Sequence, residues 1–151
     1  MATEPSNHPN TIVKLRAADL PRLETLLHEH RLPTDDCAAQ LPAFCGIFED
    51  AQLIAAGGLE TAGDFGLLRS VVVDPAHRGQ GLARLITNHL VDQARQMNLR
   101  AIYLLTETAD AYFTRLGFER VDRDSAPQPI TQTRQFAGLC PDSAVFMRLS
   151  L

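Results

Sequence analysis

The sequence predicts an α/β domain built on a mixed central sheet, and three observations lead to this prediction. An apolar, β-branched run at 65–73 has the continuous pattern of a strand buried on both faces. An amphipathic helix follows it at about 81–97, and a second apolar strand follows at 101–106. A strand–helix–strand unit of this kind places its two strands parallel through a right-handed crossover.

The elements before this unit are assigned from shorter signals. Apolar residues alternate at 12–15, which predicts a first strand. Asp19 is placed to begin a helix that ends near residue 30. A second short helix is expected at 34–41. Two strands joined by a turn at 49–51 then lead into the long central strand.

The elements after the unit complete the sheet. A short helix at 109–116 is closed by Gly117, because glycine readily adopts the left-handed conformation that ends a helix. Strands are expected at 118–122 and 144–151. A polar, proline-bearing segment at 125–141 lies between them and is called the excursion below. We expect it to hold a helical turn, and it is either functional or a flexible surface loop. The sheet then has about six to seven strands and is flanked by about four helices.

Length and composition limit the classes of function that the chain can have. The chain has 151 residues, of which 45% are hydrophobic and 21% charged, as in a single globular domain. A formal net charge of −4 and a pI near 5.7 do not favour a nucleic-acid partner. No apolar run is long enough to span a bilayer. We therefore expect a flexible tail at 1–10 and a single domain at 11–151, with no membrane partner.

The cysteines indicate a reducing compartment. Cys37, Cys45 and Cys140 are odd in number and contain no C-x-x-C pair, so a disulfide framework is not expected. This pattern fits the cytoplasm. The histidines have no spacing typical of a metal site, and no metal is expected.

The stretch 71–90 carries the main functional signal. A strand ends at Asp74-Pro75, and the pair Gly79 and Gly81 precedes the amphipathic helix. The first amides of a helix have no intrahelical partner, and the helix dipole makes that end positive. Glycines let the backbone approach an anion closely. The arrangement predicts a phosphate site, although neither the P-loop nor the dinucleotide-binding spacing is present.

The sequence Arg78-Gly79-Gln80-Gly81-Leu82-Ala83 resembles the [RQ]-x-x-G-x-[GA] signature of the GNAT superfamily of acetyltransferases. The flanking Val-Asp-Pro and the segment Ala-Tyr-Phe-Thr-Arg-Leu-Gly-Phe at 111–118 are also similar to that family, as is the element order from residue 11 onward. The resemblance implies the GNAT fold, with a splay between the fourth and fifth strands. It also implies that acetyl-CoA is the co-substrate and that a homodimer can form.

The resemblance further implies how acetyl-CoA is held. Strand residues would pair with its pantetheine arm, and the turn and first helical residues would hold its diphosphate. An amide at or near Val71 would polarise the thioester carbonyl, in the manner of an oxyanion hole. The implied cofactor-binding residues are Val71, Val72, Val73, Arg78, Gly79, Gln80, Gly81, Leu82, Ala83 and Arg84.

The catalytic residues depart from the family pattern. Many relatives have a tyrosine acid four residues before the Gly of the last Gly-Phe, where this chain has Phe113. Tyr112 lies one residue earlier, rotated by roughly 100° on a helix, so its alternatives are a catalytic acid and a packed amphipathic residue. The glutamate base of many relatives is replaced by Leu67. Glu107 and Glu60 are the substitute candidates, each with the alternative of a solvated carboxylate. A water chain to bulk solvent is the other alternative for the base.

Three residues are candidates for acceptor binding. Arg69 interrupts a buried strand, so it either clamps a substrate carboxylate or pairs with an acid such as Glu60. Strict alternation would place Arg69 and Val71 on one face of the strand. Arg134 and Cys140 lie in or beside the excursion, where they contact substrate or serve only as surface and packing residues.

The acceptor is expected to be the amine of a small molecule. The segments at 67–83, 103–118 and 139–148 are similar to small GNAT proteins of arsenic-resistance operons, and the second also resembles N-acetylglutamate synthases. These resemblances imply an amino-acid-like acceptor and a link to arsenic or toxicant resistance. The alternatives are a non-catalytic acyl-CoA sensor and a protein N-acetyltransferase.

Overall fold

The computed structural model describes residues 11–151, and the tail expected at 1–10 lies outside the described residues. The described chain forms two compact units. The first contains the residues up to Gly57 together with Ser70–Thr87, and the second contains Gly58–Arg69 and Asn88–Leu151. The single domain expected at 11–151 stays a prediction.

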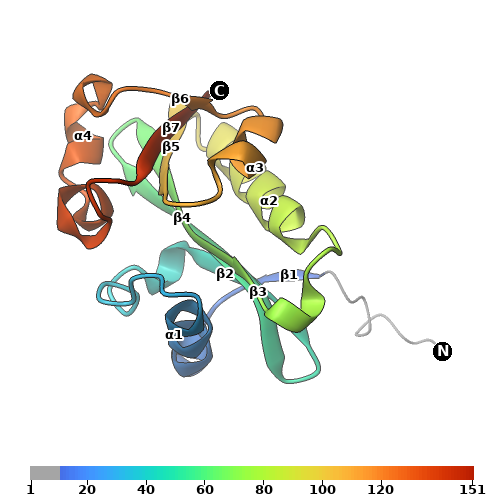
Figure 1. The fold of residues 1–151 in the computed structure, drawn as a ribbon. Coiled ribbons are helices and arrows are strands. Elements are labelled where there is room, and N and C mark those ends of the chain that lie inside the picture. Colours follow the sequence, from blue (N-terminus) through green and yellow to red (C-terminus); the bar gives the residue numbers. More distant parts are fainter. Residues whose placement is uncertain (1–10) are drawn as a thin grey trace. The chain divides into compact units, whose positions relative to one another are not determined.

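Seven strands follow the order β1-β2-β3-β4-β5-β7-β6, within the predicted range (Figure 1). The sheet is mixed, as predicted: β4 and β5 pair in parallel, whereas β1 with β2 and β7 with both β5 and β6 pair antiparallel. The strand bounds are β1 Ile12–Lys14, β2 Phe44–Glu49, β3 Gln52–Ala62, β4 Phe65–Val73, β5 Ala101–Thr106, β6 Glu119–Arg120 and β7 Val145–Ser150.

The parallel pairing of β4 with β5 is short. It runs from Phe65 opposite Ala101 to Leu67 opposite Tyr103 and stops there, although both strands continue. Beyond this point the register pairs β5 with β7 as far as Thr106, and the parallel pairing with β4 does not resume. This is the splay between the fourth and fifth strands that the resemblance implied.

The α-helices are α1 Leu20–Glu29, α2 Leu82–Gln96, α3 Asp110–Arg115 and α4 Gln128–Thr131. The 3₁₀ turns are η2 Ala17–Asp19, η3 Leu41–Ala43, η4 Pro75–His77 and η5 Arg123–Ser125, and η6 Gln135–Leu139 is a π-helix. None of the helices in residues 11–151 has the length and apolar character needed to cross a bilayer.

The helix predicted at 34–41 is wrong. Residues 35–40 form turns, and the short 3₁₀ helix η3 follows them directly. The stretch before η3 is only six residues long, which is too short to be stable as a helix without strong packing of one face.

The core of the first unit forms between α1 and the strands. Leu23, Leu26 and Leu27 lie on the buried face of α1 and pack with Phe44 and Leu53 of the sheet. Helical spacing places these three leucines on one side. Each buried leucine contributes about 1.5–3 kcal/mol relative to an exposed one. Val72 of β4, the strand that leads to the turn before α2, belongs to the same core.

The core of the second unit includes the excursion. Ile130 of α4 is fully buried, and Phe136 of η6 packs edge to face on Phe146 at 5.3 Å between ring centroids. Phe146 in turn stacks on Tyr103 of β5 at 5.2 Å. The predicted helical turn is therefore present as α4 and η6, and apolar contacts hold the excursion on the sheet.

Candidate functional site

The turn between η4 and α2 has the backbone that the phosphate interpretation requires. Gly79 has φ of 81° and Gly81 has φ of 76°, in the left-handed region that favours glycine. A side chain built on either residue would meet nothing within 4 Å. The backbone of this turn is therefore uncovered in the direction from which a ligand would approach.

The helix that follows presents unpaired amides to this space. The first helical bond runs from the Leu85 amide to the Gly81 carbonyl at 3.0 Å. The amides of Leu82, Ala83 and Arg84 thus have no intrahelical acceptor. Leu82 is buried and anchors the first turn, whereas Arg84 is exposed.

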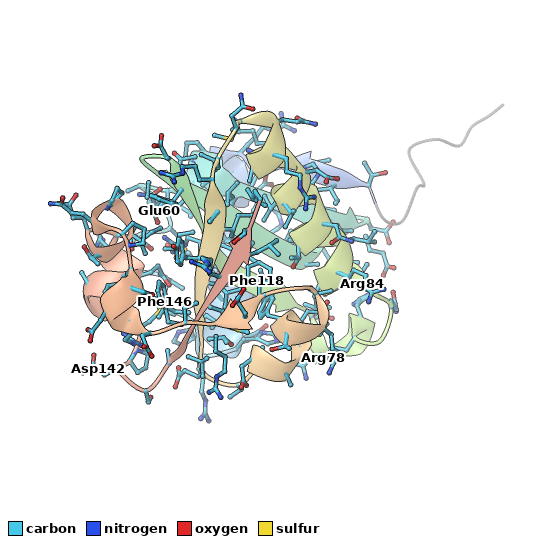
Figure 2. All side chains as sticks on the ribbon, turned by 90° about the horizontal axis from the view of Figure 1, so that it is seen from above. Glu60, Arg78, Arg84, Phe118, Asp142 and Phe146 are labelled. Atoms are coloured by element: carbon cyan, nitrogen blue, oxygen red, sulfur yellow. The ribbon has the colours of Figure 1, made fainter. Side chains whose placement is uncertain are left out.

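The two arginines add positive charge around these amides. Figure 2 shows Arg78 before α2 and Arg84 in its first turn. Both are exposed. Together with the helix dipole they make the turn suited to a diphosphate.

His77 fixes the chain immediately before the turn. Its Nδ1 donates to Asp74 Oδ2 at 2.9 Å, and its Nε2 donates to Glu49 Oε1 at 3.0 Å. Asp74 Oδ2 also accepts the Ala76 amide at 3.2 Å, and the Asp74 amide donates to the Ile54 carbonyl at 2.8 Å. We call Glu49, Asp74 and His77 the clamp.

The clamp favours the charged imidazole ring. A carboxylate only accepts hydrogen bonds, so a ring placed between two carboxylates carries a proton on each nitrogen. The hydrogen bond to Asp74 first, and that to Glu49 second, raise the pKa of His77 above its usual value of 6.5. The two carboxylates thus favour the imidazolium form of this ring more than water does.

Strand β4 is interrupted by an unusual backbone at Ser70. Its φ is 58°, a conformation that costs energy for a residue other than glycine. Strict alternation through Arg69 and Val71 is therefore wrong, because the left-handed residue between them breaks the pleat. After the break, Val72 is buried in the core, and Val71 and Val73 are half-buried.

In the second unit, Arg69 and Glu60 are brought together. Arg69 is only 4% exposed, and its Nη1 lies 3.3 Å from Glu60 Oε1 of β3. The ion-pair interpretation of Arg69 is thus observed. Glu60 is half-buried in this pair, so an acid–base role for it would require the pair to open.

The other catalytic candidates lie on two different segments. Glu107 follows β5 and is exposed. Tyr112 is half-buried on α3, with the Arg115 guanidinium 5.6 Å from its ring centroid. Phe113, at the position of the family tyrosine, is buried against Phe118 at 5.7 Å. Tyr112 keeps both of its alternatives, a catalytic acid and a packed amphipathic residue, and a base at Glu107 stays a prediction.

The excursion holds the last two acceptor candidates. Arg134 is exposed, and Cys140 is half-buried with its thiol donating to Gln135 Oε1 at 3.1 Å. Gln135 is buried in the π-helix η6, a helix type that occurs often at functional sites. Substrate contacts by Arg134 and Cys140 stay predictions.

The remaining cysteines are buried. Burial raises the pKa of the Cys45 thiol to about 12. A thiol with so high a pKa is a poor nucleophile and a poor metal ligand. Cys37 is also buried, and Cys37, Cys45 and Cys140 form no disulfide with one another.

Sequence reasoning missed the clamp and the strained strand residue. The spacing of Asp74 and His77 could have suggested their contact, since Asp74 precedes the proline of a turn. Glu49 is 28 residues from His77, and no local pattern links them. Ser70 carries no signal either, because serine is not a residue that requires a positive φ.

Comparison with known proteins identifies the family of this chain and several proteins that resemble it. Residues 11–118 match the Acetyltransferase (GNAT) family. An amino-acid acetyltransferase of Mycobacterium tuberculosis is 36% identical over 59 residues, which is 39% of this chain and 33% of that relative. The chain therefore spans about a third of the length of that curated relative.

Solved structures share the fold. An N-acetylglutamate synthase from Neisseria gonorrhoeae, complexed with coenzyme A and N-acetyl-glutamate, has a TM-score of 0.80 at 19% identity, over 93% of this chain and 35% of that one. Rv2747 from Mycobacterium tuberculosis, in complex with CoA, has a TM-score of 0.79 at 20% identity, over 93% of this chain and 99% of that one. The ribosomal-protein-S18-alanine N-acetyltransferase from Escherichia coli has a TM-score of 0.71 at 20% identity, over 93% of this chain and 92% of that one. The same fold thus serves proteins that differ in acceptor.

Proposed function

Since the chain belongs to the acetyltransferase (GNAT) family, we propose that it transfers an acetyl group from acetyl-CoA to the amine of a small, amino-acid-like molecule. The observation that carries this proposal is the turn before α2. Its two glycines have positive φ with open space above them, and they precede unpaired helical amides. This is a binding place for the diphosphate of the coenzyme.

Acetyl transfer to an amine needs little chemical assistance from individual side chains. The neutral amine attacks the thioester carbonyl, the new C–N bond forms, and the C–S bond breaks as the thiolate leaves. The amine proton passes to a base or to water, and the sulfur takes up a proton. Well-oriented reactants reach effective molarities of about 10⁵–10⁸ M, so positioning alone supplies much of the acceleration.

The chain's own groups have proposed roles in this step. An amide at Val71 or a neighbour in β4 would stabilise the oxyanion, as the family resemblance implies. The break in the pleat at Ser70 supports this role, because it reorients the main chain at that point of the strand. Arg78 and the residues through Arg84 would hold the diphosphate.

The acceptor class is supported by the relatives. The amino-acid acetyltransferase named above is a curated protein that the chain resembles over 59 residues. With Arg69 already paired to Glu60, we propose that the excursion contributes acceptor contacts through Arg134 and Cys140. We also propose that the activity is linked to arsenic or toxicant resistance, as the sequence resemblance implied.

A turnover assay over a panel of acceptors tests this function. We expect thiol release from acetyl-CoA with amino acids or related amines, and mass spectrometry should show an added acetyl group on the nitrogen. Coenzyme binding without turnover on any acceptor would instead support a sensor. For the arsenic link, the expected result is improved growth of a sensitive host on arsenite, and unchanged growth would refute the link.

A second candidate is acetylation of a protein N-terminus. It is favoured by the shared fold with the ribosomal-protein-S18-alanine N-acetyltransferase. Peptides belong in the same panel for this reason. Turnover on peptide amines but not on free amino acids would replace the small-molecule proposal with this one.

A further inference from the structure

The clamp of Glu49, Asp74 and His77 lies outside the turn that binds the coenzyme, and the proposed function leaves it without a role. We propose that His77 is a positioning residue for the coenzyme, which holds the turn beginning at Arg78 in its binding conformation by tying it to the end of strand β2. This inference rests on the acetyl-CoA function proposed above and deepens it.

The clamp restrains η4 from two sides. Asp74 anchors the start of η4 through its amide to Ile54 of β3, and its carboxylate holds the Ala76 amide and the His77 ring. Glu49, the last residue of β2, holds the other nitrogen of the same ring. The end of η4 is therefore bound to the end of β2 by a ring whose two nitrogens both have a carboxylate partner.

The turn has little else to hold it in place. Gly79 and Gly81 have no side chains, and Arg78 and Gln80 are exposed. Glycine loses more backbone entropy than any other residue when it is fixed. Order must come from the flanks, where Leu82 is buried on one side and His77 is clamped on the other. Fixing the turn before binding removes that entropic cost from the binding free energy.

Charge acts in the same direction. The groups that face the ring are Glu49 from β2 and Asp74 from the loop before η4. With the ring protonated, the clamp has a net charge of −1, from two carboxylates and one imidazolium. When the ring loses its proton, the net charge becomes −2, and one ring nitrogen presents a lone pair to a carboxylate. Both changes disfavour a bound diphosphate.

The direction of the pH dependence follows. The pKa of His77 is raised, so the clamp is intact below the ordinary value of 6.5 and persists above it. It is lost as pH rises through the raised pKa. Coenzyme affinity should therefore fall with rising pH in the wild-type protein, relative to a variant that cannot titrate at this position.

Calorimetric titration with coenzyme A tests the proposal. We expect His77→Phe to bind roughly tenfold more weakly than wild type at about pH 6, with the ratio shrinking towards one at a second, higher pH that lies above the ring pKa measured by NMR. We expect His77→Arg to retain affinity at both pH values, because a guanidinium stays charged and donates to both carboxylates. Ionisation of the coenzyme itself cancels in these ratios.

Controls separate the clamp from folding and from the proposed function. His28→Phe changes an exposed histidine of α1 in the same unit and should leave affinity unchanged at both pH values. Thermal melts without coenzyme identify any variant that fails to fold. If wild type does not bind coenzyme A, the proposed function fails. If wild type binds and His77→Phe binds equally at both pH values, only the clamp proposal fails.

A second measurement does not depend on the phenylalanine variant. NMR titration of the His77 ring in Glu49→Gln should show its pKa moving down towards the ordinary value, because one of the two carboxylates has become neutral. The pH at which coenzyme affinity falls should move down with it. An affinity profile that stays in place while the ring pKa moves would overturn the proposal.

Discussion

Arg69 is a buried cation, and its partner Glu60 offsets the cost of removing that charge from water. Removing one member of such a pair leaves the other uncompensated. We predict that Arg69→Met lowers the free energy of unfolding by about 3 kcal/mol, measured by urea denaturation. Arg134→Met, which removes an exposed arginine of the same unit, is the matched control and should change stability little.

The double variant separates this explanation from simple loss of packing. Arg69→Met combined with Glu60→Leu removes both charges, so it should recover most of the lost stability. A double variant as unstable as the sum of its single changes would show that the pair itself is not the source of the loss.

Tyr112 tests a second residue-scale question. The tyrosine ring packs with Arg115 and Phe113, contacts that phenylalanine can keep. Position 113, where many relatives have the acid, is occupied by a buried phenylalanine. We therefore predict that Tyr112→Phe folds normally and keeps kcat within about twofold of wild type, since a positioned acid contributes about 10²-fold or more. A large loss of kcat at unchanged KM would restore Tyr112 as the acid.

At the scale of elements, the turn before α2 makes the sharpest prediction. A side chain at Gly81 has room but projects into the space above the turn, and φ of 76° strains any β-branched residue. We predict that Gly81→Val weakens coenzyme A binding by about 100-fold or more while the thermal melt stays cooperative. Gly81→Ala should give a smaller loss in the same direction.

Gly138 provides the matched control for this element. A side chain added there would also meet nothing within 4 Å, but the φ of Gly138 is not in the left-handed region. Gly138→Ala should therefore leave coenzyme affinity unchanged. Equal coenzyme A affinity for wild type and Gly81→Val would show that the diphosphate does not bind at this turn.

Periodic elements can be predicted from the sequence, and irregular ones cannot. The apolar rhythm of α2 and the continuous run of β4 specify those elements because burial requires that spacing. The turns at 35–40 have the composition of a helix, but the stretch is too short to be stable as one without strong packing. The length of the excursion marks it in the sequence, whereas its π-helix η6 depends on packing against β7.

At the scale of the whole molecule, the family and the turn before α2 could be predicted from the sequence, because both depend on contiguous residues. The family match at 11–118 confirms the resemblance drawn from Arg78–Ala83 and its flanks. The clamp depends on a contact between residues that are 28 positions apart in the sequence, and the Arg69–Glu60 pair joins residues nine positions apart. Of these two contacts, only the Arg69–Glu60 pair was among the alternatives raised from the sequence. Contacts between distant segments are decided by register and backbone geometry, which one sequence does not display.

The central claim is that the main chain before and at the start of α2 binds the diphosphate of acetyl-CoA. Calorimetric titration of the purified protein with acetyl-CoA, and in parallel with pantetheine, which lacks the diphosphate, tests it most directly. We predict a single site for acetyl-CoA whose affinity falls as salt is added, and far weaker binding of pantetheine. Absence of acetyl-CoA binding, or equal affinity for the two compounds, would contradict the account.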